Sequence, residues 1–369
     1  MQNIKLLCLI CFSTIFFSCT LLNISATDNK VIVGSNTDEP VKFETVIKNS
    51  QDSIVLLSIS PFEDPETDTS QNAVCSGVIV DEIGHVLTNY HCVHNQKTIF
   101  LYYYDEEDWG EYKVEIVGTD PLADLALLKI LDSDKKLKPL KFAKDTEKLE
   151  VGTEVFALGH PMSMAWSVTK GIISSNNRYA RHPYIHALQT DAAINKGNSG
   201  GPLMNMKGEI VAINSLMISK VNENAGIAIS IRADVVKHSI KTMLEYGIVD
   251  RGALGIMITP LGDERQRDKI LKKNPTVNQK NIPNTLGLLI SEDETIPEEL
   301  KLWDTVVAIG GVPINNGIEF AEEMNKYEIG KKVSVTIIRK KRFIQLDLMI
   351  KVFEVPVDKM YDRPGVVKP

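Results

Sequence analysis

Short apolar segments separated by turn residues fill the middle of the chain. Between Ser53 and Ile231 they recur at roughly ten-residue intervals, and glycines, Asp-Pro and Asn pairs lie between them. A long series of short strands with no helical pattern between them predicts an all-β sandwich or barrel. The expected strands are 54–57, 77–80, 86–88, 98–104, 112–117, 125–130, 154–158, 166–169, 171–174, 187–190, 209–214 and 227–231.

The pattern changes after this region. Residues 232–246 carry apolar side chains at near-helical spacing, and Gly247 follows as a typical helix stop. We therefore expect a helix and a domain boundary here. The rest of the chain predicts a small α+β domain, with strands at 254–258, 287–290, 303–309, 332–339 and 343–352 and a short helix at 318–324. The polar insertion 262–284 is expected to be a solvated loop, and the proline-containing segment 355–369 a tail.

The N-terminus has the pattern of an export signal. Lys5 precedes an uncharged apolar run, Leu6 to Leu22, and the sequence Asn-Ile-Ser-Ala ends at Ala26. This predicts a signal peptide cleaved after Ala26. A retained membrane anchor and lipoprotein processing at Cys19 are the alternatives, and in each case the rest of the chain is exported. Residues 27–49 are mixed and polar, which predicts a poorly ordered or oligomer-forming arm.

Composition narrows the function classes. The 369 residues are long enough for two domains, and their 24% charged and 43% hydrophobic content is ordinary for a globular protein. A formal net charge of −7 argues against nucleic acid as a partner. Of five cysteines, three lie in the export segment, so cleavage leaves only Cys75 and Cys92 in an oxidising compartment.

One stretch, Thr190 to Leu203, carries the strongest chemical signal. It predicts a strand, a tight turn and a second strand, with Ser199 in the turn beside Gly197, Gly200 and Gly201. Glycines allow backbone N–H groups to point at a ligand and to approach it closely. Ser199 is therefore a candidate nucleophile, and the N–H groups of Gly197 and Ser199 are candidates for an oxyanion hole.

A serine nucleophile needs a base and a group that orients the base. His91 ends an expected strand, and Asp124 lies where a loop enters an apolar strand. Asp120 is a weaker candidate because it precedes a proline. The order is then His91, Asp124, Ser199. The spacing His91-Cys92-Val93-His94 also fits a metal site, but the sequence has no second Cys/His cluster, so we expect neither a metal nor a cofactor.

Together these segments resemble the HtrA/DegP family of exported trypsin-fold serine proteases. The matching motifs are Thr88 to His91, Asp124 to Leu128 and Gly197 to Leu203, and the resemblance covers about Ser53 to Tyr246. It implies two β-barrels with the triad between them, hydrolysis of unfolded or damaged exported proteins, and assembly as a homotrimer. His160 stands where the family usually has asparagine.

The resemblance also indicates finer features. Cys75 and Cys92 bracket the strands that lead to the histidine, as a disulfide does in animal trypsin-like enzymes, so a disulfide is our hypothesis and two buried thiols the alternative. Ala193, six residues before Ser199, would form the base of the specificity pocket, with Ile227, Ala228 and Ile229 as its wall. An apolar pocket of this kind predicts cleavage after small or medium aliphatic residues.

The C-terminal segment resembles a permuted PDZ domain. Leu254, Gly255 and Ile256 look like the loop that binds the carboxylate of a C-terminal peptide, and residues 318–324 like the helix beside the groove. The family's usual glycine before Asp304 is replaced by Trp303. A small structural domain without a ligand is the alternative. The expected domains are 1–26 leader or anchor, 27–49 arm, 50–247 protease, 248–354 PDZ and 355–369 tail.

The favoured function is therefore an exported serine endopeptidase of protein quality control, in the periplasm or another extracytoplasmic space. The sequence leaves two alternative functions open. The first is a chaperone that binds unfolded polypeptides and cleaves them only secondarily. The second is an anchored, site-specific regulatory protease that responds to a PDZ ligand.

Overall fold

The structure is a computed structural model. It describes residues 42–61, 73–104, 108–131, 137–160, 166–180, 185–217, 226–262, 264–273, 282–291 and 296–352. The expected leader, most of the expected arm and the C-terminal tail lie outside these ranges. Within them, no helix is long and apolar enough to cross a membrane.

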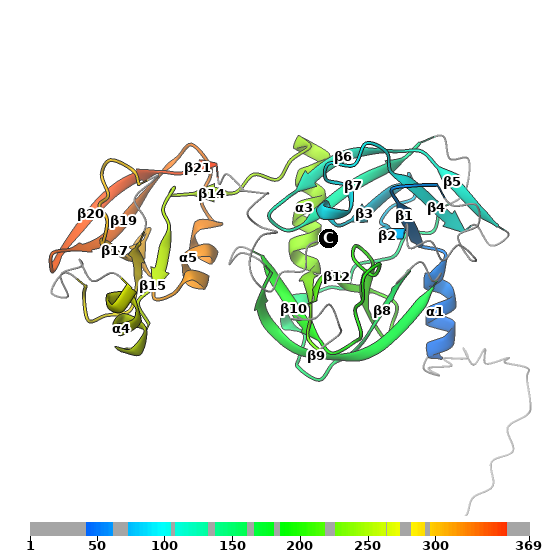
Figure 1. Cartoon of the computed structure of the whole chain (residues 1–369), viewed down its shortest axis with the longest axis horizontal. Coiled ribbons are helices and arrows are strands. Elements are labelled where there is room, and N and C mark those ends of the chain that lie inside the picture. The colour runs from blue at the N-terminus through cyan, green and yellow to red at the C-terminus, as the bar shows by residue number, and fades with distance from the viewer. Residues whose placement is uncertain are drawn as a thin grey trace, which may run out of the picture. The chain divides into compact units, whose positions relative to one another are not determined.

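The first half of the protease-like region forms one antiparallel sheet in the order β5-β4-β1-β2-β3-β7-β6 (Figure 1). Every residue of β1 and β3 is buried, so the sheet encloses an apolar core on the side of Val55, Leu57 and Leu128. Its strands are β1 (Ile54–Ser58), β2 (Ala73–Ile79), β3 (His85–Thr88), β4 (Phe100–Tyr104), β5 (Trp109–Tyr112), β6 (Val114–Asp120) and β7 (Leu125–Ile130).

The second half forms a closed barrel in the order β10-β13-β12-β11-β8-β9. Its strands are β8 (Glu154–Gly159), β9 (Ser167–Tyr179), β10 (His186–Thr190), β11 (Pro202–Asn205), β12 (Ile210–Met217) and β13 (Ala228–Arg232). The all-β character expected from the sequence is confirmed. One detail differs: β9 is a single strand where two were expected. Gly171 marks a close approach to the backbone of Ala192 and not a turn.

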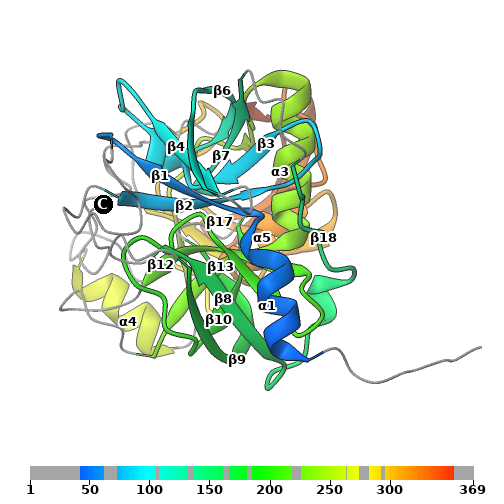
Figure 2. The ribbon, with the colours of Figure 1, turned by 90° about the vertical axis from the view of Figure 1, so that its right-hand side faces the viewer.

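Helices flank these sheets. They are α2 (Tyr90–Val93), the 3₁₀ helix η1 (Thr146–Lys148) and α3 (Ala233–Tyr246), which ends at Gly247 with φ 76° as expected. A further helix, α1 (Phe43–Gln51), was not expected, because residues 27–49 read as an arm. Phe43 meets Phe156 of β8 edge-on with ring centroids 5.1 Å apart, and Figure 2 shows α1 in front of this barrel. The end of the arm is therefore a packed helix.

The C-terminal region has its own sheet, in the order β15-β16-β17-β19-β20, with β18 paired to β17. Its elements are β14 (Gly252–Ala253), β15 (Ile258–Pro260), α4 (Glu264–Lys273), β16 (Leu288–Ile290), β17 (Thr305–Ile309), β18 (Val312–Pro313), α5 (Gly317–Met324), β19 (Lys332–Arg339), β20 (Arg342–Met349) and β21 (Lys351–Val352). Asn316 caps the N-terminus of α5, and its side chain accepts from two backbone N–H groups of the helix.

The prediction of a solvated loop at 262–284 is wrong for residues 264–273, which form helix α4. Ile270 of this helix is buried with Leu261 and Leu289, and Trp303 packs against the same cluster. Trp303 adopts φ 73°, the left-handed region that favours glycine, which explains why a glycine suits this position. Apolar contacts with the cluster offset the backbone strain of the tryptophan.

Candidate active site

His91 and Asp124 meet beside the first sheet, next to strands β3 and β7. His91 lies in α2 directly after β3, and Asp124 lies in the turn between β6 and β7. Nδ1 of His91 is 2.8 Å from Oδ2 of Asp124 and 3.0 Å from Oδ1. The carboxylate also accepts the backbone N–H of His91 at 3.0 Å. These contacts fix the ring and leave its Nε2 free of the carboxylate.

The position of Asp124 is closely determined. Its side chain is 1% exposed and its φ is 58°, a left-handed conformation that aspartate tolerates better than most residues. Its carbonyl oxygen accepts from the backbone of Tyr90 at 3.0 Å and from the side chain of Asn89 at 2.8 Å. The turn that carries the acid is thus bound to the segment that carries the histidine.

Asp120 has a different partner. It is fully buried and forms an ion pair with Arg251, with 2.6 Å between Nη2 and Oδ2. It also accepts from the hydroxyl of Ser239 in α3 at 2.6 Å. The geometry therefore favours Asp124 over Asp120 as the partner of the histidine.

The turn that holds Ser199 packs against β2 and against the end of β3, the strand directly before His91. The carbonyl of Ser199 accepts from the backbone of Ser76 in β2 at 2.8 Å. Gly200, at φ 84°, leaves no space for a Cβ, which would clash with the carbonyl of Ser76 and the hydroxyl of Thr88. Glycine at this position thus lets the barrel bring the serine next to β3. Across the described residues, the Ser199 hydroxyl makes no hydrogen bond to His91, a contact that commonly tightens only when substrate binds.

Two backbone donors in this turn are available. The N–H groups of Gly197 and Ser199 have no hydrogen-bond partner in the part of the chain that the structure describes. Gly197 has φ 101°, a conformation that glycine adopts without strain. Its carbonyl is held by the hydroxyl of Ser76 at 2.7 Å. The turn can therefore present two N–H groups to one oxygen atom.

Two serines near the site were missed in the sequence. The Ser215 hydroxyl in β12 donates to Oδ2 of Asp124 at 2.7 Å, across 91 positions of sequence. The Ser76 hydroxyl accepts the backbone N–H of His160 at 2.9 Å while it donates to Gly197. A single serine inside an apolar strand carries no local signal, so only the tertiary pairing identifies either residue.

His160 lies behind the turn and is completely buried. Burial lowers the pKa of its imidazole to about 3, so the ring is neutral at ordinary pH. Its Nδ1 lies 3.3 Å from the backbone N–H of Trp166, and the Trp109 and Trp166 rings stack with centroids 5.0 Å apart. The His160 ring therefore packs inside the protein next to two tryptophans and does not act as a second base.

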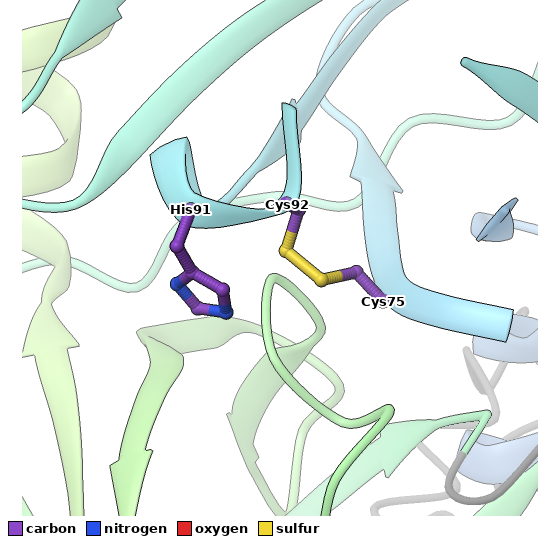
Figure 3. A group of neighbouring side chains, drawn as sticks. All are labelled: Cys75, His91 and Cys92. Carbon is purple, nitrogen blue, oxygen red and sulfur yellow. A yellow bond between two sulfur atoms is a disulfide. The ribbon is translucent and has the colours of Figure 1, made fainter. Parts of the chain in front are cut away.

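Cys75 of β2 and Cys92 of α2 are bonded as a disulfide in the structure, with Cα atoms 6.0 Å apart (Figure 3). Both are buried, and Cys92 directly follows His91. The bond therefore connects the short helix that carries the histidine to the strand that holds the serine turn.

The expected pocket residues lie near one another in the barrel. Thr190 pairs with Ala228, which places the segment leading to Ala193 beside the start of β13. Ala193 accepts from the hydroxyl of Thr169 at 2.9 Å. Ala228 and Ile229 are buried, whereas Ile227 is 38% exposed.

The expected carboxylate loop precedes the edge strand of the C-terminal sheet. Leu254 is buried, and Gly255 has φ 66°. β15 follows this loop and, among the described residues, pairs with β16 alone, and α5 contacts it. An edge strand and a helix thus lie together, as expected for the groove.

Comparison with known proteins identifies the fold family. The family model of the trypsin-like peptidase domain matches residues 75–213. The DegP periplasmic serine endoprotease of Salmonella typhimurium is 33% identical over 280 residues, which are 75% of this chain and 56% of the relative. The probable periplasmic serine protease do/HhoA-like of Haemophilus influenzae is 35% identical over 274 residues, 72% of this chain and 55% of the relative. The chain thus spans little more than half the length of these relatives.

Solved structures agree on the fold. The HtrA-type protease AlgW, solved with a decapeptide, superposes with a TM-score of 0.70 at 23% identity and covers 86% of this chain and 100% of its own. The serine endoprotease from Yersinia pestis gives 0.63 at 24% identity, over 85% and 99% of the two chains. With its trypsin-like peptidase domain and these relatives, the chain belongs to the HtrA/DegP family of serine proteases.

Proposed function

We propose that the chain is an exported serine endopeptidase that cleaves unfolded or damaged polypeptides with His91, Asp124 and Ser199. The observation that carries this proposal is the contact of 2.8 Å between His91 Nδ1 and the buried Asp124 carboxylate. The glycine-rich turn that holds Ser199 packs against Ser76 and Thr88, close to this pair in the fold. The names of the relatives, periplasmic serine endoproteases, support the same activity.

Each residue has a defined task in the proposed reaction. Nε2 of His91 takes the proton of Ser199 as the hydroxyl oxygen attacks the peptide carbonyl carbon. Asp124 holds the imidazole in the required tautomer and stabilises the imidazolium. The N–H groups of Gly197 and Ser199 bind the oxyanion that forms, an interaction worth about 3 kcal/mol per donor in other enzymes. His91 then returns the proton to the leaving amine, and water hydrolyses the acyl-enzyme.

The proposed substrate preference follows from the barrel. Ala193 forms the floor of the specificity pocket and Ile227, Ala228 and Ile229 its wall. An apolar floor offers no partner for a Lys or Arg side chain, so the protease is expected to cleave after small or medium aliphatic residues. A peptide library would test this, because cleavage mainly after basic residues contradicts it.

The C-terminal region is proposed to act as a PDZ domain. In the part of the chain that the structure describes, β15 ends its sheet with α5 beside it, and this arrangement supports addition of a peptide as an extra strand. Leu254, Gly255 and Ile256 would bind its terminal carboxylate through backbone N–H groups. The proposed role is recruitment of substrate or regulation of the protease.

The proposed site of action is outside the cytoplasm, in the periplasm or an equivalent space, as the names of the relatives indicate. A homotrimer and attachment through the N-terminal segment are further parts of the proposal. Light scattering of the purified full chain would give the subunit number, and a monomer at all concentrations contradicts the trimer.

The test compares wild type with Ser199→Ala in two assays. Wild type is expected to degrade casein and to react with a fluorophosphonate, and Ser199→Ala to do neither while keeping the same circular dichroism. A loss of turnover on the order of 10⁶-fold is expected from other triad enzymes. If both proteins leave casein intact and both suppress its aggregation, the chaperone reading replaces the protease.

A further inference from the structure

Three atoms of the kind that bind soft metal ions lie together where the disulfide meets the candidate catalytic histidine. The sulfur atoms of Cys75 and Cys92 and a ring nitrogen of His91 lie within 4.8 Å of one another. Figure 3 shows the edge of the imidazole opposite Nδ1 facing the two sulfurs. In the oxidised protein the sulfurs are bonded to each other, so neither is a thiolate ligand.

We infer that reduction of the Cys75–Cys92 disulfide turns this cluster into a site for Zn²⁺ or a similar soft divalent ion, and that the bound ion blocks His91. The metal site is inferred from the three clustered ligand atoms and does not depend on the proposed protease function. Its consequence, loss of hydrolysis, does rest on that proposed function.

The distances suit a metal. Zinc binds Cys sulfur at about 2.3 Å and His nitrogen at about 2.0 Å, so tetrahedral ligand atoms lie roughly 3.5 to 3.8 Å apart. Each sulfur already lies within 4.8 Å of the His91 nitrogen, and once the disulfide is broken, small side-chain rotations move the two sulfurs apart to this spacing. Two thiolates and an imidazole favour zinc over the oxygen-seeking ions magnesium and calcium. Solvent would take the fourth position.

The outer contacts of His91 also suit a metal ligand. Metal-binding histidines commonly donate their second ring N–H to a carboxylate, which fixes the tautomer. Here Nδ1 already lies 2.8 Å from Asp124, so Nε2 is the nitrogen presented for ligation. The same contact that prepares Nε2 as a base prepares it as a ligand.

His94 does not belong to this cluster, although its spacing from His91 and Cys92 resembles a metal motif. Its Nδ1 is 2.6 Å from the hydroxyl of Tyr90, and it is absent from the metal-ligand group of the described residues. His94 therefore provides a matched control for a histidine in the same segment.

Reduction of the disulfide creates the two thiol ligands. A dithiol reductant gives two electrons and two protons, the Cys75–Cys92 bond breaks into two thiols, and the reductant becomes a disulfide. The thiols lose their protons to solvent when the metal binds as a dithiolate complex. Because the ion occupies the lone pair of Nε2, His91 cannot take the proton of Ser199. Transfer of a disulfide from an oxidised donor reverses the sequence and releases the ion.

Metal binding can be measured without activity. Full-length Ser199→Ala is reduced with a phosphine, which forms its oxide and adds no competing thiol, and is then titrated with Co²⁺. A thiolate-to-cobalt absorption band that saturates at about one ion per chain and disappears on addition of Zn²⁺ is expected. The oxidised form of the same protein and Cys75→Ser should lack the band, and His94→Ala should keep it.

A missing band in the reduced protein overturns the inference, as does an equal band in the oxidised form. The oxidised and reduced samples share one sequence, so this comparison holds even if Cys75→Ser fails to fold. Circular dichroism of the reduced sample verifies that its fold is kept.

Inhibition is tested on wild type by fluorophosphonate labelling. One equivalent of Zn²⁺ should slow labelling of the reduced protein at least tenfold, with recovery after chelation, and change that of the oxidised protein less than twofold. Equal inhibition of both forms overturns the redox control. If the fluorophosphonate labels wild type under none of these conditions, the proposed hydrolase activity is wrong. The cobalt band then still tests the metal site.

Discussion

At the scale of single residues, Ser215 is the clearest positioning residue of the candidate triad. It is buried and donates to Asp124 at 2.7 Å. A hydrogen bond to a charged group is worth about 1.5 to 3 kcal/mol. We therefore expect Ser215→Ala to lower kcat roughly ten- to a hundredfold, with little change in KM, because the side chain faces the carboxylate. Steady-state kinetics on a peptide substrate measures both constants.

Ser230→Ala is the matched control for that variant. Ser230 is a buried serine on the adjacent strand, and its hydroxyl donates to Asn214 at 2.9 Å. Kinetic constants within about twofold of wild type are expected. If both variants lose kcat equally, the effect comes from disturbed strands and the role of Ser215 in positioning Asp124 is wrong.

His160 should make the free energy of unfolding fall as the pH is lowered. Its unfolded pKa of 6.5 falls to about 3 in the folded protein because burial disfavours the charged ring. The unfolded chain therefore binds the proton first, and stability is lost as the pH drops below the unfolded pKa. From about pH 7 to about pH 5 this residue alone should reduce the free energy of unfolding by about 2 kcal/mol.

Urea unfolding of wild type and His160→Asn at these two pH values measures this effect. The variant should lose about 2 kcal/mol less than wild type on acidification, whatever its stability at neutral pH. His238→Asn, at an exposed histidine of α3, should behave like wild type. An identical pH response in His160→Asn contradicts the assignment.

Sequence and structure agree on residues that carry a local signal. His91 follows an apolar strand, Asp124 precedes one and Ser199 lies among glycines, so each stands out in the sequence, and the structure brings the first two into contact. Ser76 and Ser215 could not be found in this way. Their partners lie 121 and 91 positions away in the sequence, and their strands show only an ordinary apolar pattern.

At the scale of elements, helix α1 shows where the pattern was too weak. Its sequence is polar apart from Phe43, Val46 and Ile47, which is too short an apolar stripe to separate a packed helix from an arm. Its stability comes from tertiary contacts: Val46 is 5% exposed and packs beside Gly208 in the turn between β11 and β12. α4 was missed for the same reason: among its described side chains, Ile270 is the one buried in an apolar cluster.

Truncation of Val46 tests whether α1 is part of the protease fold. Removal of two buried methyl groups should lower the free energy of unfolding by about 2 kcal/mol. Asn49→Ala, on the exposed side of the same helix, should change it by less than about 0.5 kcal/mol. Urea denaturation of the full chain gives both values. If Val46→Ala behaves like Asn49→Ala, the helix does not contribute to the stability of the barrel.

At the scale of the whole molecule, the chain combines a candidate catalytic site with a candidate peptide-binding strand, β15. The candidate catalytic groups come from both halves of the trypsin-like region, and the Gly200 turn needs close contact between these halves. In the C-terminal region, Leu261, Ile270 and Leu289 form a buried apolar cluster, and β15 is the end strand of its sheet among the described residues. The two sites share one chain, so a ligand at one can act on the other only through a difference in affinity between states of the protein.

A peptide with an apolar C-terminus is expected to bind at the edge of β15, as fluorescence polarisation can measure. The same peptide with an amidated C-terminus should bind at least about tenfold more weakly, because charged hydrogen bonds from backbone N–H groups to the carboxylate are lost. Equal affinity of the two peptides contradicts a carboxylate loop at Leu254 to Ile256. Fluorophosphonate labelling with saturating peptide then separates the two proposed roles. A faster reaction with the free-acid peptide but not with the amide indicates regulation of the active site, whereas an unchanged rate with intact binding indicates recruitment of substrate.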